Sequence, residues 1–389
     1  MSKQKQFIGI DVGSELTKIA VVSMKNEQLF LEHVIVEPTP PSLYSEDKIV
    51  NGNELAPIIN GFLEEYGVRS KTASIVLKSS EENVKHSFMK VPILSQVEMN
   101  KMLPSLISDE TAIELDTFYW NSLFLDEQAL QKMKAKSKDK KKKQETADTS
   151  ATAKGMDIHA CIVPKSTVDE SLAMTKRLKK KLYYTEPDVF SLKRLYDLSH
   201  EKNKGTYVLV DISKHRTTLT YVHEGFIRLI RPLNVGFDRI STTLQEEMMS
   251  SEEEVLALLP TIEVGRREDY ASPDREDYES EDRDEERMRQ MAYYSDLLKE
   301  SIEEITDQVD GTNFFFSGEF QAEIQQVILC GGGAQLKGIE RVFEEALSTP
   351  SAKIGDSFSK MEVSEEARNH FALGASAIGL VMKEVTDYA

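Results

Sequence analysis

The sequence predicts an α/β protein made of two similar halves. Its opening residues read as three strands, at 6–12, 16–24 and 29–37, and an acid and a tight turn follow the first strand. The same order returns at 206–233, "TYVLVDISKHRTTLTYVHEGFIRLIRPL". A third observation is an apolar strand that runs into three glycines, "VILCGGG", at 327–333. An internal repeat of this kind predicts two related α/β domains that face each other.

The composition is typical of a soluble protein in a reducing compartment. The 389 residues are enough for two or three domains, and 40% of them are hydrophobic. No run approaches the roughly 20 apolar residues of a membrane span, and "MSKQKQF" does not resemble a signal peptide, so we expect a cytoplasmic protein. Cys161 and Cys330 are expected to be buried thiols. The net charge of −18 argues against nucleic-acid binding.

Two strongly charged runs interrupt the pattern of strands and helices. Residues 132–154 are rich in lysine, and residues 265–287 are strongly acidic. Neither run holds enough apolar residues to offset the entropy lost on ordering, so both are expected to be disordered surface insertions. The functional alternatives are that the lysines contact anionic lipid and that the acidic run docks a basic partner.

Hydrophobic periodicity predicts the elements between and after the two repeats. A serine, Ser95, stands where a helix N-cap is expected. The expected strands are 72–77, 117–125 and 156–164, and the expected helices are 53–68, 96–110, 165–182, 191–198, 239–259 (as more than one helix), 288–309 and 371–382.

The turn after the first strand carries groups that suit a phosphate. Gly13 lets backbone N–H groups come close, Ser14 adds a hydroxyl and Lys18 adds positive charge. Asp11 repels a bare phosphate, so it fits such a site only through an intervening cation such as hydrated Mg²⁺. The alternative is a turn without a ligand, because many Asp-x-Gly sequences are only turns.

The second repeat supplies a matching turn. Asp211 stands where the first repeat has Asp11, and Thr217 is one of several hydroxyl residues in "SKHRTTL". The counterpart of Gly13 is Ser213, whose side chain is expected to crowd a phosphate. Two such turns across a cleft predict a metal–phosphate site.

The glycine run predicts a ligand at close range. A strand, three glycines and then a helix bring backbone near a ligand at the helix N-terminus. Each glycine costs roughly 0.5–1 kcal/mol relative to alanine. This cost favours a ligand role for Gly331, Gly332 and Gly333 over a plain turn.

The order of the three motifs resembles that of the actin-like ATPase superfamily, which has a duplicated, ribonuclease H-like fold. In that superfamily they are the two phosphate motifs and the adenosine motif. The resemblance implies ATP or ADP with Mg²⁺ in the cleft between the two domains, with Asp11 and Asp211 at the metal. The residues that it implies around the nucleotide are Asp11, Gly13, Ser14, Lys18, Asp211, Thr217, Gly236, Gly331, Gly332 and Gly333.

Within the superfamily the chain resembles the PilM family and the cytoplasmic part of the secretion protein GspL. The resemblance lies in "GIDVGSELTKIAVV", "VDISKHRTTLTYVHEGFIRLIRPLNVGFDRIS" and "VILCGGGAQLKGI". Residues 86–107 and 113–125 resemble the extra subdomain that PilM shares with FtsA. The domains implied are the first actin-like domain (1–80, 166–204 and the closing helix in 356–389), the extra subdomain (81–165) and the second actin-like domain (205–355).

The resemblance implies a scaffold at the inner face of the cytoplasmic membrane, in a type IV pilus or type II secretion assembly platform. Its implied partner is the cytoplasmic tail of a PilN-like bitopic membrane protein, bound in a groove between the core and the extra subdomain. A homo-oligomer is a second option. Trp120, the sole tryptophan, either lines that groove or packs in the subdomain core. The protein is not expected to span the membrane itself.

Two alternative functions are an active actin-like ATPase and an FtsA-like division tether. No catalytic base or sugar pocket is evident, which argues against a kinase. The chain departs from the pattern of its relatives at Ser213, at Gly236, which is one glycine where relatives often have two, and in lacking a lysine after the acidic residues 252–254. These departures imply weak or absent hydrolysis. The ending "GLVMKEVTDYA" is not expected to provide the membrane helix of an FtsA-like tether.

Overall fold

The computed structural model is an α/β protein with two large sheets and one small subdomain sheet. It describes residues 5–80, 82–126, 131, 155–200, 205–265, 281–356 and 358–388. The lysine-rich run and the first part of the acidic run, up to residue 280, lie outside the described residues. Their predicted disorder stays a prediction.

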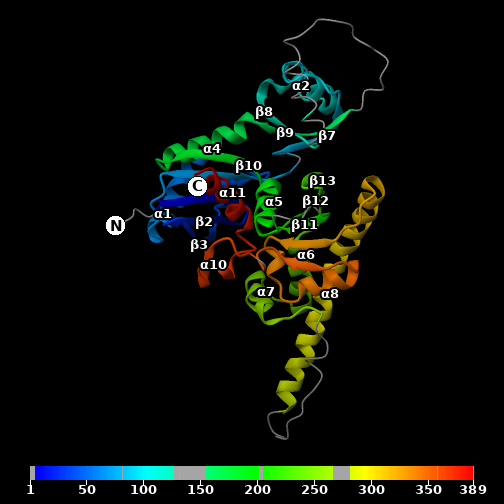
Figure 1. Ribbon diagram of the computed structural model, residues 1–389. Coiled ribbons are helices and arrows are strands. Elements are labelled where there is room, and N and C mark those ends of the chain that lie inside the picture. The colour runs from blue at the N-terminus through cyan, green and yellow to red at the C-terminus, as the bar shows by residue number, and fades with distance from the viewer. Residues whose placement is uncertain are drawn as a thin grey trace, which may run out of the picture. The chain divides into compact units, whose positions relative to one another are not determined.

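A six-stranded sheet holds the first repeat (Figure 1). Its strand order is β10-β6-β1-β2-β3-β16, in which β10 runs parallel to β6 and β16 runs parallel to β3. The strands are almost continuously apolar where they are buried, which is typical of a sheet covered on both faces. They are β1 (Lys5–Val12), β2 (Leu16–Lys25), β3 (Gln28–Pro38), β6 (Thr72–Leu77), β10 (Lys181–Pro187) and β16 (Glu362–Val363).

A five-stranded sheet holds the second repeat. Its order is β13-β12-β11-β14-β15, with β11, β12 and β13 antiparallel and β14 parallel to both β11 and β15. A large apolar core packs against this sheet from the helices α6, α8 and α9. The strands are β11 (Tyr207–Ile212), β12 (Thr217–His223), β13 (Phe226–Leu233), β14 (Gln326–Cys330) and β15 (Ser351–Lys353).

The repeat predicted from the sequence is present in the backbone. In the first turn the N–H of Gly13 donates to the carbonyl of Leu16 at 3.0 Å, and in the second the N–H of Ser213 donates to the carbonyl of Arg216 at 2.9 Å. Each turn joins an acid-ended strand to the next antiparallel strand. The serine therefore closes the same hydrogen-bonded turn as the glycine does.

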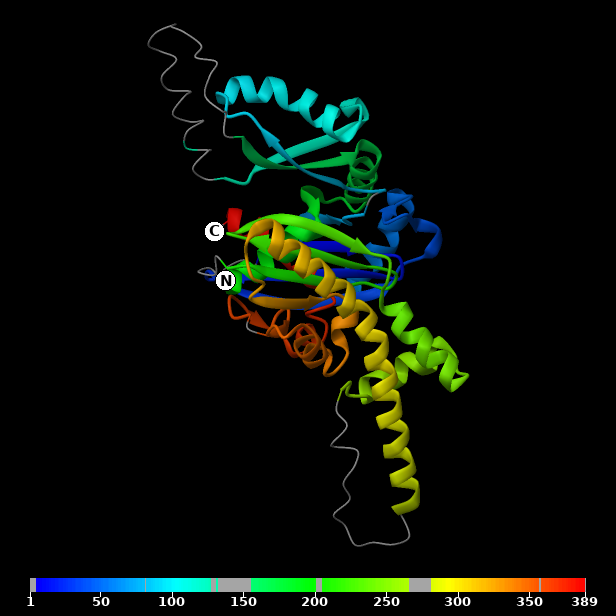
Figure 2. The ribbon, with the colours of Figure 1, turned by 90° about the vertical axis from the view of Figure 1, so that its right-hand side faces the viewer.

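A three-stranded antiparallel sheet forms the small subdomain, with the order β7-β9-β8. The helix α2 covers one face of it (Figure 2). Ser95 caps this helix as predicted, because its side chain accepts from the N–H of Glu98 while the Glu98 carboxylate accepts from the N–H of Ser95. The elements are β7 (Lys85–Val91), β8 (Phe118–Phe124), β9 (Met156–Pro164) and α2 (Gln96–Thr111).

The remaining elements are mostly helices that cover the sheets. Among the described residues, no helix combines the length and the apolar character needed to cross a bilayer. The helices are α1 (Gly52–Glu65), α4 (Lys165–Arg177), α5 (Asp188–Ser199), α6 (Phe237–Met248), α7 (Glu252–Leu258), α8 (Glu281–Phe320), α9 (Ile339–Leu347), α10 (Glu365–Asn369) and α11 (Ala375–Tyr388). The short elements are η1 (Pro41–Leu43), β4 (Tyr44–Ser45), β5 (Lys48–Ile49), η2 (Leu115–Thr117), η3 (Leu259–Thr261) and η5 (Gly333–Gln335).

Several helices differ in their bounds from those that periodicity predicts, and two of the differences fall beside charged runs. The helix expected over 165–182 ends at Arg177, because Lys179 adopts φ +56°, and strand β10 follows. The long helix expected from residue 288 begins at Glu281, so the last residues of the acidic run are helical. Lysine and glutamate are good helix formers, so composition alone places neither boundary.

By its contacts the chain divides into two compact units. One contains Met1–Gly9, Lys18–Val36 and Val189–Ala389, and the other contains Ile10–Thr17 and Glu37–Asp188. Asp11 and the small subdomain thus belong to one unit, and the five-stranded sheet belongs to the other. The domain boundaries implied by the resemblance stay a prediction.

Candidate functional site

Asp11 lies at the carboxyl end of β1, and a lysine that follows β6 holds it there. Asp11 is almost completely buried, at 1% exposure. The ammonium Nζ of Lys78 lies 3.0 Å from Asp11 Oδ2, and the Lys78 side chain is only 12% exposed. This ion pair is buried, so its charges interact far more strongly than a surface pair does.

A second carboxylate completes this group. Asp188, the first residue of α5, places Oδ2 at 3.7 Å from Lys78 Nζ and accepts a hydrogen bond from the N–H of Ser79 at 3.0 Å. We call Asp11, Lys78 and Asp188 the Lys78 cluster. Its three side chains come from β1, the end of β6 and the start of α5, all within one compact unit.

Tyr44 belongs to the surroundings of the Lys78 cluster. It is 6% exposed, and its hydroxyl has no hydrogen-bond partner among the described residues. Burial raises its pKa well above the ordinary value. The positive charge of Lys78 opposes this shift, and the carboxylates of Asp47, Asp11 and Asp188 add to it. The phenol therefore stays neutral.

The Lys78 cluster bears directly on the predicted Mg²⁺. The sequence argument requires a cation beside Asp11, and the structure supplies one as the ammonium of Lys78. Asp11 Oδ2 could ligate a metal directly only after leaving this partner. Among the described residues, no group of three or more His, Cys, Asp or Glu side chains could hold a metal ion. The residues present do not fit an Mg²⁺ ion bound directly by Asp11.

The other predicted residues of the first turn differ in exposure. Gly13 is buried and Ser14 is exposed, so the turn presents its serine to the surface. Lys18 is 8% exposed on β2, which makes it a buried cation and not a free surface lysine. A phosphate at this turn can be reached by the Ser14 hydroxyl and nearby backbone N–H groups.

The second turn is fixed by its own hydrogen bonds. Thr217 is fully buried and donates its hydroxyl to the carbonyl of Val235 at 2.8 Å. Gly236 is the N-cap of α6, and a Cβ there would overlap the backbone of Lys214 and Arg216. Thr217 and Gly236 therefore have structural roles that require no ligand. Asp211 is 7% exposed at the end of β11.

The glycine run has a packing reason at two of its three positions. Gly331 adopts φ +81°, and a Cβ there would overlap the carboxylate of Asp211 and the carbonyl of Ile212. At Gly333 a Cβ would overlap the side chain of Ile212. Gly332 has room, since the nearest atom to a Cβ would be Leu373 Cδ1 at 3.6 Å. Of the three, only Gly332 lacks a steric reason to be glycine.

A helix follows the glycine run, but it does not begin at the glycines. The short 3₁₀ turn η5 starts at Gly333, and the helix α9 begins at Ile339 after the N-cap Gly338. Gly338 itself packs against the backbone of Val264. The N-terminal end of α9 therefore does not stand at the glycine run, and a helix dipole cannot support a phosphate there.

The strand β8 carries a second candidate surface. Trp120 is partly buried and packs against the subdomain core with α2, which favours the core interpretation of this residue. Residues on alternate positions of a strand point to opposite faces. Tyr119 is 47% and Leu123 is 46% exposed, and β8 lies at the edge of its sheet. Sequence reasoning found this strand but selected the residue on its inner face.

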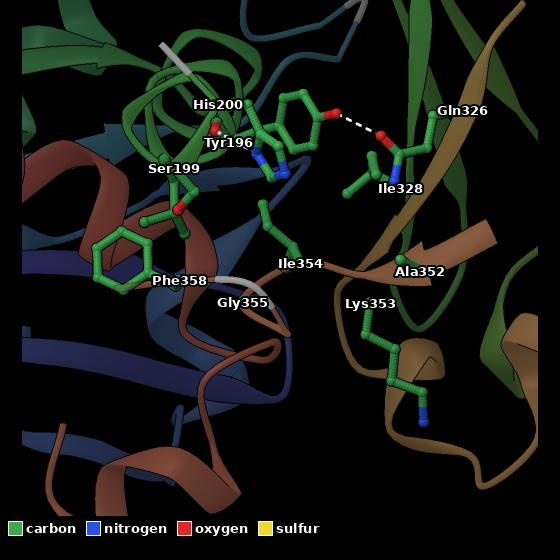
Figure 3. Close-up of a pocket in the computed structure, with 11 residues that line it drawn as sticks. Tyr196, Ser199, His200, Gln326, Ile328, Ala352, Lys353, Ile354, Gly355 and Phe358 are labelled. Carbon is green, nitrogen blue, oxygen red and sulfur yellow. Dashed lines mark hydrogen bonds between the residues drawn. The ribbon is translucent and has the colours of Figure 1, made fainter. Parts of the chain in front are cut away.

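A pocket in the unit that contains the five-stranded sheet contains none of the predicted site residues. Figure 3 shows Tyr196 of α5 and His200, the residue after α5, on one side of it and Ala352 of β15 on another, with the Tyr196 hydroxyl donating to Gln326 Oε1 at 2.6 Å. Its cavity volume is about 10 Å³. That is far below the usual range of small-molecule sites, about 300–1,000 Å³.

Known proteins match this chain in sequence and in fold. A family model described as type IV pilus assembly protein PilM matches residues 274–384. Among solved structures, the PilM-PilN type IV pilus biogenesis complex aligns with a TM-score of 0.69 and 16% identity, over 97% of this chain and 98% of that chain. The ethanolamine utilization protein EutJ from Carboxydothermus hydrogenoformans aligns with a TM-score of 0.50 and 11% identity, over 98% of this chain and 90% of that chain.

The duplicated sheets, their matching acid-ended turns and these alignments define the class: the chain has the α/β fold of the actin-like ATPases. Within that class its fold is PilM-like. The fold class predicted from the sequence is confirmed.

Proposed function

We propose that this protein is a PilM-like adaptor of a type IV pilus assembly machine, located in the cytoplasm and held at the inner membrane by a PilN-like partner. One observation carries the proposal. The PilM family model matches residues 274–384, and the PilM-like fold extends over nearly the whole chain, so sequence and fold point to the same family. The solved complex pairs such a fold with PilN, which supports a PilN-like partner.

The edge of β8 suits the tail of such a partner. A peptide can add a strand to an exposed sheet edge, with its side chains seated on alternate residues of that edge. Tyr119 and Leu123 offer two half-exposed apolar side chains on one face, and Lys165 Nζ lies 5.6 Å from the centre of the Tyr119 ring. We take this face as the docking surface for the cytoplasmic tail.

Replacing both Tyr119 and Leu123 with serine is expected to weaken binding of the tail peptide at least about tenfold, because two apolar side chains no longer become buried. The measurement is fluorescence anisotropy with the cytoplasmic tail of a PilN-like protein from the same organism. Leu256→Ser is the matched control, since Leu256 is 45% exposed on α7 in the other unit, and it should bind normally. Deletion of residues 132–154 should also leave binding intact.

The tail model fails if the double variant binds like the wild type. It also fails if deleting 132–154 abolishes recruitment to membrane vesicles while the tail peptide has no effect. That second result would mean that the lysine-rich run attaches the protein electrostatically to lipid.

We also propose that the protein binds an adenine nucleotide, ATP or ADP. The support is the actin-like fold, together with Gly332 in the glycine run, the position where space remains beside the backbone. That the remaining predicted residues contact the same nucleotide stays a prediction.

ADP at 100 times its dissociation constant is expected to add roughly 2.7 kcal/mol to the free energy of unfolding. A thermal-shift titration with ADP measures this. Gly332→Ala should keep the fold and weaken ADP binding about tenfold, because a methyl group then blocks the approach to the backbone. Gly318→Ala is the matched control, since a Cβ at Gly318 on α8 meets nothing within 4 Å. A wild-type protein with no ADP-dependent shift would rule the nucleotide out.

A further inference from the structure

Each carboxylate of the Lys78 cluster lies near a source of positive charge. Lys78 stands between Asp11 at 3.0 Å and Asp188 at 3.7 Å, and the side chains of both carboxylates are at most 7% exposed. A buried carboxylate is stable only when it is paired and hydrogen-bonded. The ammonium of Lys78 pairs with Asp11 and donates a hydrogen bond to its Oδ2 atom.

The second carboxylate has its own compensation. Asp188 accepts from the N–H of Ser79, and it is the first residue of α5, a 12-residue helix whose N-terminal end carries partial positive charge. Tyr44 stays neutral and adds no charge. The cluster therefore needs no divalent ion to compensate its two carboxylates.

We propose that Lys78 is the resident cation of this site and takes the place of a divalent metal beside Asp11, so that nucleotide binding does not depend on Mg²⁺. The nucleotide part of this proposal rests on the proposed function. A lysine ammonium brings one charge and three donors, so it can neutralise Asp11 near a phosphate as a hydrated metal would. Lys78 is thus a positioning residue that fixes the Asp11 carboxylate.

Removing Lys78 should convert the site into a metal site. The substitution Lys78→Met keeps the length and the apolar stem but leaves Asp11 and Asp188 without their cation. Two neighbouring carboxylates without a counter-charge are the ligands that Mg²⁺ prefers. The variant should therefore gain a response to Mg²⁺ that the wild type lacks.

The test is calorimetric titration of ADP in EDTA and in millimolar Mg²⁺, together with the melting temperature in Mg²⁺ alone. For the wild type, the dissociation constant of ADP should differ by less than about threefold between the two conditions, and Mg²⁺ alone should not change the melting temperature. For Lys78→Met, Mg²⁺ should tighten ADP binding about tenfold or more and should raise the melting temperature without nucleotide.

Two further variants separate charge from packing. Lys78→Arg retains the positive charge and should remain independent of Mg²⁺. Tyr44→Phe removes the neighbouring hydroxyl without changing a charge, so it should also behave like the wild type. If Lys78→Met does not fold, ADP binding by the wild type and by Lys78→Arg decides whether the site depends on Mg²⁺. Both should bind ADP in EDTA as tightly as in Mg²⁺.

The proposal is overturned if wild-type binding of ADP tightens about tenfold or more with Mg²⁺, or if folded Lys78→Met shows no response to Mg²⁺. The absence of ADP binding in every condition would instead overturn the nucleotide part of the proposed function. The melting temperatures in Mg²⁺ alone would still decide the role of Lys78 in that case.

Discussion

Replacing Gly331 with alanine is expected to lower the free energy of unfolding by about 3 kcal/mol. The φ of +81° costs an L-residue about 1–2 kcal/mol. The added Cβ also overlaps the carboxylate of Asp211 and the carbonyl of Ile212, and pushing a well-packed strand aside costs about 1–3 kcal/mol more. For a unit of this size the melting temperature should fall by roughly 6–12 °C.

Differential scanning calorimetry of Gly331→Ala, Gly332→Ala and Gly318→Ala measures this difference. The last two should stay within about 1 kcal/mol of the wild type, because neither Cβ meets an atom closer than ordinary contact. Equal melting temperatures for Gly331→Ala and Gly332→Ala would show that the glycine run is not held by packing on β11.

The fold was predictable because its evidence is local in the sequence. Two hairpins that share an acid, a turn and the same alternation of residues identify the repeat, and the matching hydrogen bonds at Gly13 and Ser213 confirm it. The Ser95 cap was predictable for the same reason, since its partner Glu98 lies three residues away. Strand β10 was not predictable from the sequence, because "LKKKLYY" favours a helix. Only its pairing with β6 makes this segment a strand.

The candidate site was less predictable because its partners are distant in the sequence. Lys78 pairs with Asp11 across 67 residues, and nothing in "SIVLKSS" marks that lysine as a buried cation. The steric requirement for glycine at positions 331 and 333 likewise comes from distant residues. A Cβ there would overlap Asp211 or Ile212, which precede the glycines by more than a hundred residues. The sequence thus indicated that Asp11 needs a cation, and only the fold identifies it.

Acid is expected to destabilise the small subdomain through two histidines of its sheet, His86 and His159. His86 Nδ1 on β7 lies 2.9 Å from His159 Nε2 on β9, and the ring of Phe88 stacks on His159 at 4.2 Å. Burial lowers the pKa of His86 from 6.5 to about 4. For His159, burial first and the neighbouring His86 second lower the pKa from 6.5 to about 3.

The free energy of unfolding falls with falling pH because the unfolded state takes up protons before the folded state does. As the pH falls below 6.5, the unfolded chain protonates both imidazoles while the folded chain keeps them neutral, so the unfolded state is favoured. Each histidine contributes up to about 1.4 kcal/mol per pH unit, which amounts to roughly 4 kcal/mol for the pair between pH 7 and pH 4.5. Nearby Cys161 does not compensate, because burial raises the pKa of its thiol to about 12 and it stays neutral.

Urea unfolding at several pH values, followed by Trp120 fluorescence, tests this expectation. Trp120 is the sole tryptophan and pairs with Ile162 on the same small sheet, so it reports on the subdomain itself. His159→Phe should roughly halve the pH dependence of the unfolding free energy, because one of the two titrating groups is gone. His215→Gln is the control, since His215 lies in the other compact unit and its replacement should not change the unfolding of the small subdomain. Equal urea midpoints at pH 7 and pH 4.5 in the wild type would contradict a buried neutral histidine pair.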